Sequence, residues 1–140
     1  MEFVVDASVA VKWLLPEEHS ATALRLVADP AELSAPELLW VETVAALRRR
    51  VRRGDLSVEG FRDALDDIDA WRVRAEPVVP LVRPAADMAL HLGHAVYDCV
   101  YLALAERDGV RLVTADRTFH DKVEASPFAG LTLWIGDVPP

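Results

Sequence analysis

The sequence has 140 residues and a formal charge of −8, and 52% of its residues are hydrophobic and 27% are charged. This length and composition are typical of one globular domain, here residues 1–140, with enough apolar surface to form a core. The negative charge excludes a protein that coats nucleic acid through its overall charge, but it allows an enzyme whose acids hold divalent cations.

Apolar residues recur along the chain at strand spacing and at helix spacing in turn. In chain order, the predicted elements are a strand at 2–6, helices at 7–15, 17–29, 34–54 and 57–72, a strand at 76–82, helices at 83–94 and 95–109, a strand at 110–116, a helix at 117–126 and a strand at 131–136. Pro16 and Pro30 follow predicted helices, and the third helix has Pro36 near its first turn and Gly54 after its end. Strands that alternate with helices predict an α/β fold, with a mostly parallel sheet covered on both faces.

The sequence also bears on where the protein works. No apolar run approaches the roughly 20 residues that a membrane-spanning helix needs. The first residues, MEFVVD, carry acids where a signal peptide has a basic leader. Cys99 is the only cysteine, which excludes an internal disulfide and suits a reducing compartment. We therefore expect a cytoplasmic protein without a membrane partner.

Four acidic residues stand among apolar residues or at strand ends. Asp98 lies in the run AVYDCVYLAL, and Glu42 lies inside the predicted long helix among leucines and alanines. Asp6 and Asp116 stand at the ends of predicted strands. Carboxylates are seldom buried without a partner, because removing their charge from water is costly. Parallel strands end at one edge of a sheet, where ligand sites form, so we expect the four acids to meet there.

Clustered carboxylates repel one another, and Mg²⁺ or Mn²⁺ removes that conflict because both ions prefer oxygen ligands. One ion can generate hydroxide from bound water and a second can stabilise a leaving oxygen, which suits phosphoryl chemistry. Simpler interpretations exist for three of the acids. Asp6 and Asp116 would serve as helix N-caps, and Glu42 would lie on a half-exposed helix face. Asp98 is the hardest to explain in this way, since its neighbours are apolar.

Three stretches resemble the PIN-domain nucleases, and within them the VapC-type toxins of bacterial and archaeal toxin–antitoxin pairs: VVDASVAVKWLLPEE, APELLWVETVAAL and VYDCVYLALAERDGVRLVTADRTF. The resemblance runs from Phe3 to about Ile135, although the region 48–82 matches no fixed pattern. It implies a three-layer α/β/α fold and an endoribonuclease that cleaves RNA, often transfer or ribosomal RNA. It also implies a cognate antitoxin as partner, and a homodimer.

The same resemblance implies roles for individual residues, carried over from the matching motifs. One or two Mg²⁺ or Mn²⁺ ions would be bound by the catalytic acids Asp6, Glu42, Asp98 and Asp116. The supporting residues would be Ser8, Thr114 and the further acid Asp121.

Several basic residues could bind RNA phosphates on this otherwise acidic chain. They are Lys12, Arg48, Arg49, Arg50, Arg52, Arg53, Arg117 and Lys122. The alternative for the arginines is a solvated helix end, where the helix dipole favours positive charge. His91 and His94 have helical spacing but no adjoining acid or cysteine, so we interpret them as structural or exposed.

The leading interpretation is a metal-dependent endoribonuclease that acts as a toxin. The alternative is a catalytically weak protein of the same fold or an RNA-binding interaction module, which the presence of all four acids disfavours. A phosphoacceptor receiver domain would need paired acids after the first strand, and a haloacid-dehalogenase-type phosphatase would need an aspartate where Ser8 stands. Candidates for an antitoxin groove, for which we favour core packing instead, are Trp13, Leu14, Trp40 and Leu47.

Overall fold

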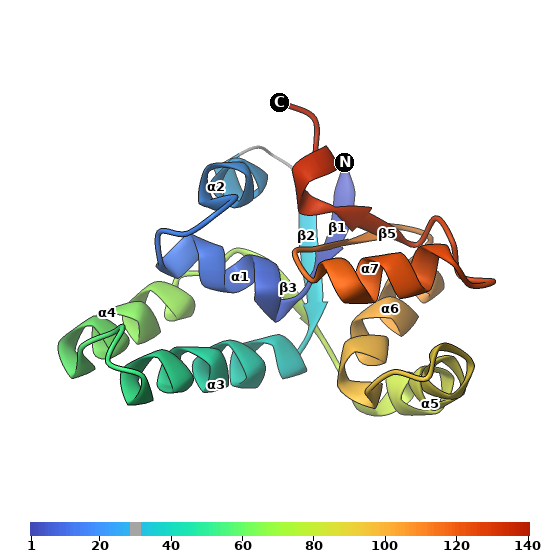
Figure 1. The fold of residues 1–140 in the computed structure, drawn as a ribbon, viewed down its shortest axis with the longest axis horizontal. Coiled ribbons are helices and arrows are strands. Elements are labelled where there is room, and N and C mark those ends of the chain that lie inside the picture. Colours follow the sequence, from blue (N-terminus) through green and yellow to red (C-terminus); the bar gives the residue numbers. More distant parts are fainter. Residues whose placement is uncertain (29–31) are drawn as a thin grey trace.

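The computed structural model describes residues 1–28 and 32–140, in which strands and helices alternate (Figure 1). The strands are β1 (Glu2–Val5), β2 (Glu32–Pro36), β3 (Val73–Glu76), β4 (Arg111–Thr114) and β5 (Thr132–Trp134). The helices are α1 (Ala7–Leu14), α2 (Ser20–Ala28), α3 (Leu38–Arg52), α4 (Val58–Asp69), α5 (Val82–Leu92), α6 (Val96–Asp108) and α7 (Arg117–Glu124). Two short 3₁₀ turns are η1 (Val79–Leu81) and η2 (Ile135–Asp137).

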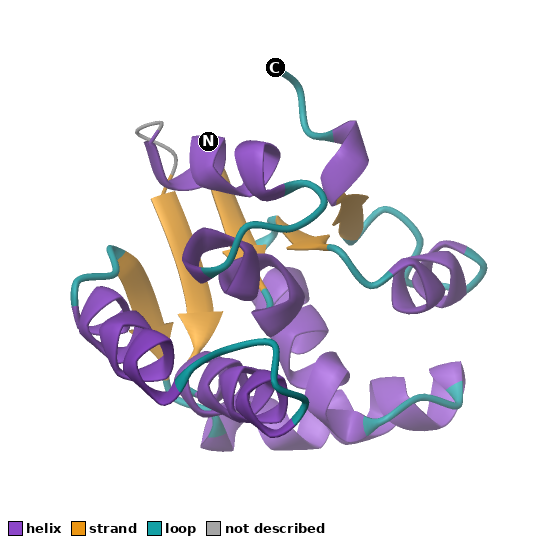
Figure 2. Cartoon of the chain, turned by 60° about the vertical axis from the view of Figure 1, so that its left-hand side comes forward, coloured by secondary structure: helices purple, strands orange, loops and turns teal. Residues whose placement is uncertain are grey.

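The strands form one parallel sheet in the order β3-β2-β1-β4-β5. Helices cover both faces, and α6 packs along β1, β2 and β4, which gives three layers, α/β/α (Figure 2). The predicted fold class is confirmed. From β1 the chain moves outward to β2 and β3, then returns to β4 and β5 on the other side. This reversal creates a switch point between β1 and β4, where α/β proteins form ligand sites beyond the carboxyl ends of the strands.

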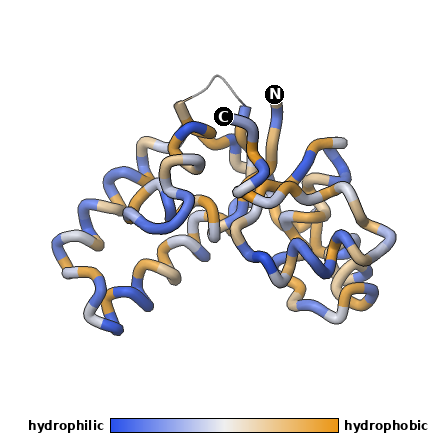
Figure 3. The backbone as a smooth tube through the Cα atoms, turned by 45° about the horizontal axis from the view of Figure 1, so that its top comes forward, coloured by the Kyte–Doolittle hydropathy of each residue, from blue (hydrophilic) through white to orange (hydrophobic). Residues whose placement is uncertain are grey.

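The core lies between the sheet and the helices that cover it. Residues 99–105 of α6 are buried without a break, which explains why that helix is apolar on all sides. A second cluster joins Leu47 of α3 to Ala64 and Ile68 of α4, so these two helices bury apolar surface against each other. Figure 3 shows apolar segments in the middle of the molecule and many hydrophilic segments on the outer helices.

One predicted helix begins too early in the sequence. The prediction runs over 34–54, whereas α3 begins at Leu38 because residues 32–36 form β2. This strand pairs with both β1 and β3 and therefore lies inside the sheet. Pro36 ends the strand and does not open the helix.

One predicted strand is displaced. The prediction runs over 76–82, but β3 spans Val73–Glu76, and the following residues form η1 and the start of α5. Pro77 and Pro80 lack the N–H group that a sheet ladder needs, which explains why the strand ends before them. The other predicted elements are confirmed, with ends that differ by up to three residues. The predicted end of the second helix at Asp29 lies outside the described residues.

No single helix in the described part of the chain is long and apolar enough to cross a membrane. The segments Val79–Leu92 and Val96–Asp108 meet these criteria only when taken together, across a bend of 115°.

Candidate active site

The neighbouring strands β1 and β4 lead into two of the predicted acids at the same edge of the sheet. Asp6 follows β1 directly, and Asp116 stands two residues after β4, which runs parallel to β1. Each carboxylate caps the helix that follows. Asp6 accepts a hydrogen bond from the Val9 N–H at 3.3 Å, and Asp116 accepts one from the Phe119 N–H at 3.0 Å. The capping interpretation is therefore correct for both residues.

Two hydroxyl groups join the loops that carry these acids. Ser8 Oγ donates to Asp6 Oδ1 at 2.5 Å and accepts a hydrogen bond from the Ala115 N–H at 2.9 Å. The buried Thr114 hydroxyl lies 3.4 Å from Ser8 Oγ and accepts a hydrogen bond from the Asp116 N–H at 3.1 Å. The structure thus places the two predicted supporting hydroxyls between Asp6 and Asp116.

Glu42 approaches from α3 and is held by a tyrosine of α6. The Tyr101 hydroxyl donates to Glu42 Oε1 at 2.5 Å, and the Tyr101 residue is only 1% exposed. Burial raises the pKa of Tyr101, and the charges of Glu42, Asp6 and Asp98 raise it further. The Tyr101 hydroxyl therefore lies within electrostatic reach of three acids from separate segments of the chain.

Burial and mutual repulsion shift the titration of these acids. Burial raises the pKa of Asp6 to about 6, even though the Ser8 hydroxyl and the Val9 N–H donate hydrogen bonds to its carboxylate. The charge of Asp98 adds to this rise. Burial also raises the pKa of Glu42, and the charge of Asp98 acts in the same direction. The group is short of positive charge, a condition that a bound cation relieves.

Asp98 is less buried than its apolar neighbours predict. Its side chain is 35% exposed, because α6 begins at Val96 and so places Asp98 in the first turn. Asp98 Oδ2 lies 2.5 Å from His94 Nε2, and His94 Nδ1 lies 3.2 Å from Lys122 Nζ. The interpretation of His94 as a merely structural or exposed residue is therefore incomplete. His94 lies between α5 and α6, so helical spacing does not predict this pair, and only the structure shows it.

Asp121 does not join this group. Its side chain is 64% exposed, and its Oδ1 lies 3.4 Å from Arg117 Nε, one turn earlier on α7. The Arg117 guanidinium also lies over the ring of Trp134, 5.0 Å from its centroid. These two predicted residues therefore pair with each other on the outer surface of α7.

The acids offer the hard oxygen ligands that Mg²⁺ and Mn²⁺ prefer. Glu42, Asp98 and Asp116 each use one carboxylate oxygen in the contacts above, and the second oxygen has no hydrogen bond to a described residue. Within residues 1–28 and 32–140, no three His, Cys, Asp or Glu side chains lie close enough to hold an ion as they stand. The donor set fits a divalent ion, but the side chains would have to turn to bind it.

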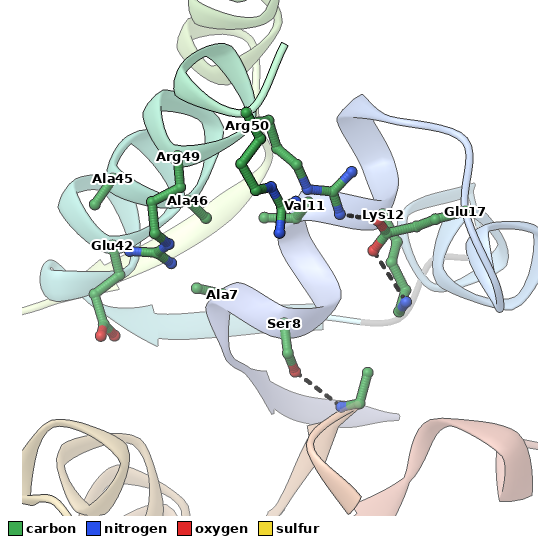
Figure 4. A pocket seen from close by; sticks show the side chains of 12 residues that line it. Ala7, Ser8, Val11, Lys12, Glu17, Glu42, Ala45, Ala46, Arg49 and Arg50 are labelled. Atoms are coloured by element: carbon green, nitrogen blue, oxygen red, sulfur yellow. Dashed lines mark hydrogen bonds and ion pairs between the residues drawn. The ribbon is translucent and has the colours of Figure 1, made fainter. Parts of the chain in front are cut away.

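A pocket of about 510 Å³ opens beside the acids, between α1 and α3 (Figure 4). Ser8 and Glu42 contribute to its lining, and its cationic residues are Lys12, Arg49, Arg50 and Arg53. Figure 4 shows the side chains of α3 and those of α1 on facing walls. The pocket therefore joins the acids to part of the predicted arginine cluster.

Of the residues considered for an antitoxin groove, Leu47 is buried, and Trp13, Leu14 and Trp40 are half-buried and pack against the core. Trp13 and Trp40 both pack against the ring of Trp71, at centroid distances of 5.3 and 6.0 Å. Leu47 is fully buried, and Leu14 packs against the cluster that Leu47 forms with α4. Core packing therefore accounts for these positions.

The sequence model of the PIN domain matches residues 3–124. The chain belongs to the PIN-domain family. Ribonuclease VapC3 of Pyrobaculum aerophilum is 33% identical to it, over 89% of this chain and 97% of the relative. VapC ribonuclease Mb0985 of Mycobacterium bovis is 35% identical, over 87% and 91%. Ribonuclease VapC1 of Mycobacterium tuberculosis is 36% identical, over 82% and 86%.

Solved PIN-domain structures share the fold. PAE2754 of Pyrobaculum aerophilum has a TM-score of 0.65 at 22% identity, over 97% of this chain and 85% of that one. Mycobacterium tuberculosis VapC20, a sarcin-ricin loop cleaving toxin, has a TM-score of 0.65 at 21% identity, over 89% and 99%. A toxin–antitoxin complex from Klebsiella pneumoniae has a TM-score of 0.62 at 13% identity, over 94% and 95%. These structures confirm the predicted fold, and the family model and the VapC relatives confirm the predicted family of PIN-domain ribonuclease toxins.

Proposed function

We propose that this PIN-domain protein is an endoribonuclease that hydrolyses RNA phosphodiesters with water, using Mg²⁺ or Mn²⁺. The observation that carries the proposal is that Tyr101 donates a hydrogen bond to Glu42 and that the charges of Asp6, Glu42 and Asp98 all act on the Tyr101 hydroxyl. A fold gains nothing from placing three carboxylates together, whereas a divalent cation uses them as ligands. The VapC relatives support the reaction class.

The proposed ligands for one or two ions are Asp6, Glu42, Asp98 and Asp116. A bound divalent ion lowers the pKa of an attacking water and stabilises the leaving oxygen. The protein supplies the orientation: Ser8 holds one oxygen of Asp6, Tyr101 holds one oxygen of Glu42, and the helix cap fixes Asp116. Asp121, which pairs with Arg117, is left out of this proposed site.

We further propose that the protein acts in the cytoplasm as the toxin of a toxin–antitoxin pair. Its proposed partners are RNA, a cognate antitoxin that restrains the nuclease, and a second copy of the chain in a homodimer, with no membrane. The proposed RNA contacts are among the basic residues Lys12, Arg48, Arg49, Arg52, Arg117 and Lys122. The VapC ribonuclease relatives support RNA as the substrate, and the toxin–antitoxin complex from Klebsiella pneumoniae, which shares the fold, supports an antitoxin partner.

Cleavage of a mixed cellular RNA pool by purified protein tests the enzymatic part. Wild type should cleave with Mg²⁺ or Mn²⁺ and not with EDTA, and Asp98→Asn should lose cleavage because it keeps the shape of the side chain but removes its charge. Asp66→Asn, on the exposed face of α4, is the matched control and should cleave like wild type. Absence of cleavage with every metal, in folded wild type, would favour a catalytically weak PIN-domain protein or an RNA-binding module.

A further inference from the structure

One face of α3 changes from acidic to basic along its length. The residues of this face recur at helical spacing and all line the pocket: Glu42, Ala45, Ala46, Arg49, Arg50 and Arg53. The small alanine side chains leave room between the acid and the arginines. Helical side chains lean toward the helix N-terminus, so the arginines extend back over this space. Figure 4 shows the Arg49 guanidinium extending along the helix toward Glu42.

The opposite wall of the pocket already contains an anion. Glu17 Oε1 accepts a hydrogen bond from Lys12 Nζ at 3.1 Å, and Glu17 also pairs with Arg50. Burial opposes its ionisation, but the hydrogen bonds from Arg50 and Lys12 hold the pKa of Glu17 below its ordinary value. An internal carboxylate therefore pairs with two of the cations that line the pocket.

The other two arginines of the pocket are open to an outside anion. Among the described residues, Arg49 forms no close ion pair, although its charge lowers the pKa of Glu42, and Arg53 pairs only with Asp55, at 3.3 Å. The side chains of Arg53 and Asp55 are 62% and 54% exposed, and such surface pairs contribute little free energy. A stronger anion can therefore displace Asp55 at small cost.

We propose that this pocket binds a backbone phosphate of RNA adjacent to the scissile phosphate, with Arg49 and Arg53 as its direct contacts. This inference rests on the proposed ribonuclease function. Arg49 follows Glu42 by seven positions, about 10 Å along the helix, so an RNA strand held at the acids passes the arginines next. With a formal charge of −8, the chain repels RNA as a whole, and binding therefore needs local cations.

The proposal divides the predicted arginine cluster. Arg48 lies on another side of α3 and borders a separate hollow with Arg62 and Phe61 of α4. Among the described residues, none of the four proposed metal ligands lines that hollow. Arg62 of α4 and Arg83 of α5 are exposed, do not line the pocket and are not among the proposed RNA contacts, so they provide a matched control pair.

Fluorescence anisotropy of a labelled single-stranded RNA of mixed sequence, in EDTA to prevent cleavage, tests this division. Arg49→Gln with Arg53→Gln should weaken binding about tenfold at low salt and reduce the slope of log affinity against log salt by about 1.4, as expected for two lost phosphate contacts. The control, Arg62→Gln with Arg83→Gln, removes the same charge and should leave that slope unchanged. Circular dichroism verifies that both double variants are folded.

Glu17 supplies a test in the opposite direction. Glu17→Gln frees Lys12 and Arg50 to bind phosphate, so it should tighten RNA binding and steepen the salt slope by about 1.4. Weakened binding in this variant would show that the ion pair shapes the pocket for RNA in another way, and would overturn the assignment of Glu17 as a competing anion.

The outcomes separate this inference from the ribonuclease proposal. Equal loss of RNA binding in both arginine double variants, or no loss in either, overturns the pocket as a phosphate site. A further outcome is that wild type binds polyglutamate through Arg49 and Arg53, whereas RNA binding does not depend on these two arginines. The pocket would then serve an acidic protein partner, and the inference would be wrong. The ribonuclease proposal fails separately, when wild type shows no metal-dependent cleavage even though RNA binds as expected.

Discussion

Replacing Asp6 with asparagine should stabilise the metal-free protein at neutral pH. The amide keeps the shape of the side chain and can still cap α1, but it carries no charge. Burial raises the pKa of Asp6 from its ordinary value of 3.8 to about 6. When folding raises the pKa of an acid, the acid favours the folded state most while it is protonated, below about pH 4 here. That contribution to stability is lost as the pH rises through the pKa of the acid in the folded state. The loss is about 3 kcal/mol, and asparagine does not suffer it.

Urea unfolding in EDTA at pH 4 and at pH 7 measures this effect. The free energy of unfolding of Asp6→Asn minus that of wild type should be small at pH 4 and about 3 kcal/mol larger at pH 7. Saturating Mg²⁺ at pH 7 should reduce or reverse the difference, because only wild type has the carboxylate that an ion would stabilise. Asp66→Asn, whose side chain is exposed on α4, is the control and should show no such change with pH.

A difference that stays constant between pH 4 and pH 7 would refute the argument, because it would mean that the Asp6 carboxylate is as well solvated in the folded protein as in the unfolded chain. A stabilised variant whose advantage Mg²⁺ leaves unchanged has a different meaning. It would support the burial of the charge but exclude Asp6 from the metal ligands. Neither measurement depends on knowing the RNA target.

Three further results are expected for residues around the acids. Tyr101→Phe should lower the single-turnover cleavage rate about tenfold, because Glu42 loses the hydrogen bond that fixes one of its carboxylate oxygens. An unchanged rate would show that other contacts orient Glu42. His94→Ala should also slow cleavage, and His94→Gln should restore part of the rate because the glutamine amide can donate a hydrogen bond to Asp98. Equal rates for the two variants would count against a role of His94 in positioning Asp98. Asp116→Ser should abolish cleavage while unfolding like wild type, whereas Asp116→Ala should cost about 1 kcal/mol of stability through the lost helix cap.

The fold could be predicted where each element shows its own pattern. The helix at 95–109 is recognisable because its apolar residues fill every face, and β1 and β4 are recognisable as apolar runs that end before an acid. β2 is not, because ELSAP contains a serine and a proline and becomes a strand through its pairing with β1 and β3. Such pairing is a property of the neighbouring strands, which the local sequence does not report.

The same distinction explains what could be predicted of the site. A carboxylate among apolar residues is anomalous in any fold, so Glu42 and Asp98 stand out in the sequence. A tyrosine on an apolar helix is ordinary, and only the structure shows that the Tyr101 hydroxyl meets Glu42 from another segment. Helical spacing places Arg49 and Arg53 on the face of Glu42, but only the packing of α3 against α1 shows that this face lines a pocket.

Capping and metal binding are compatible uses of the same acid in this fold. Every strand that runs into a helix needs a residue to satisfy the first N–H groups of that helix, and Asp6 and Asp116 both do so beside the switch point of the sheet. Capping by Asp116 engages one carboxylate oxygen and fixes the backbone, and its other oxygen has no hydrogen bond to a described residue. The parallel sheet then brings the two caps together, because β1 and β4 end at the same edge. A site of this kind can form from caps that the fold already requires, and the acids on α3 and α6 add the charge that only a cation can balance.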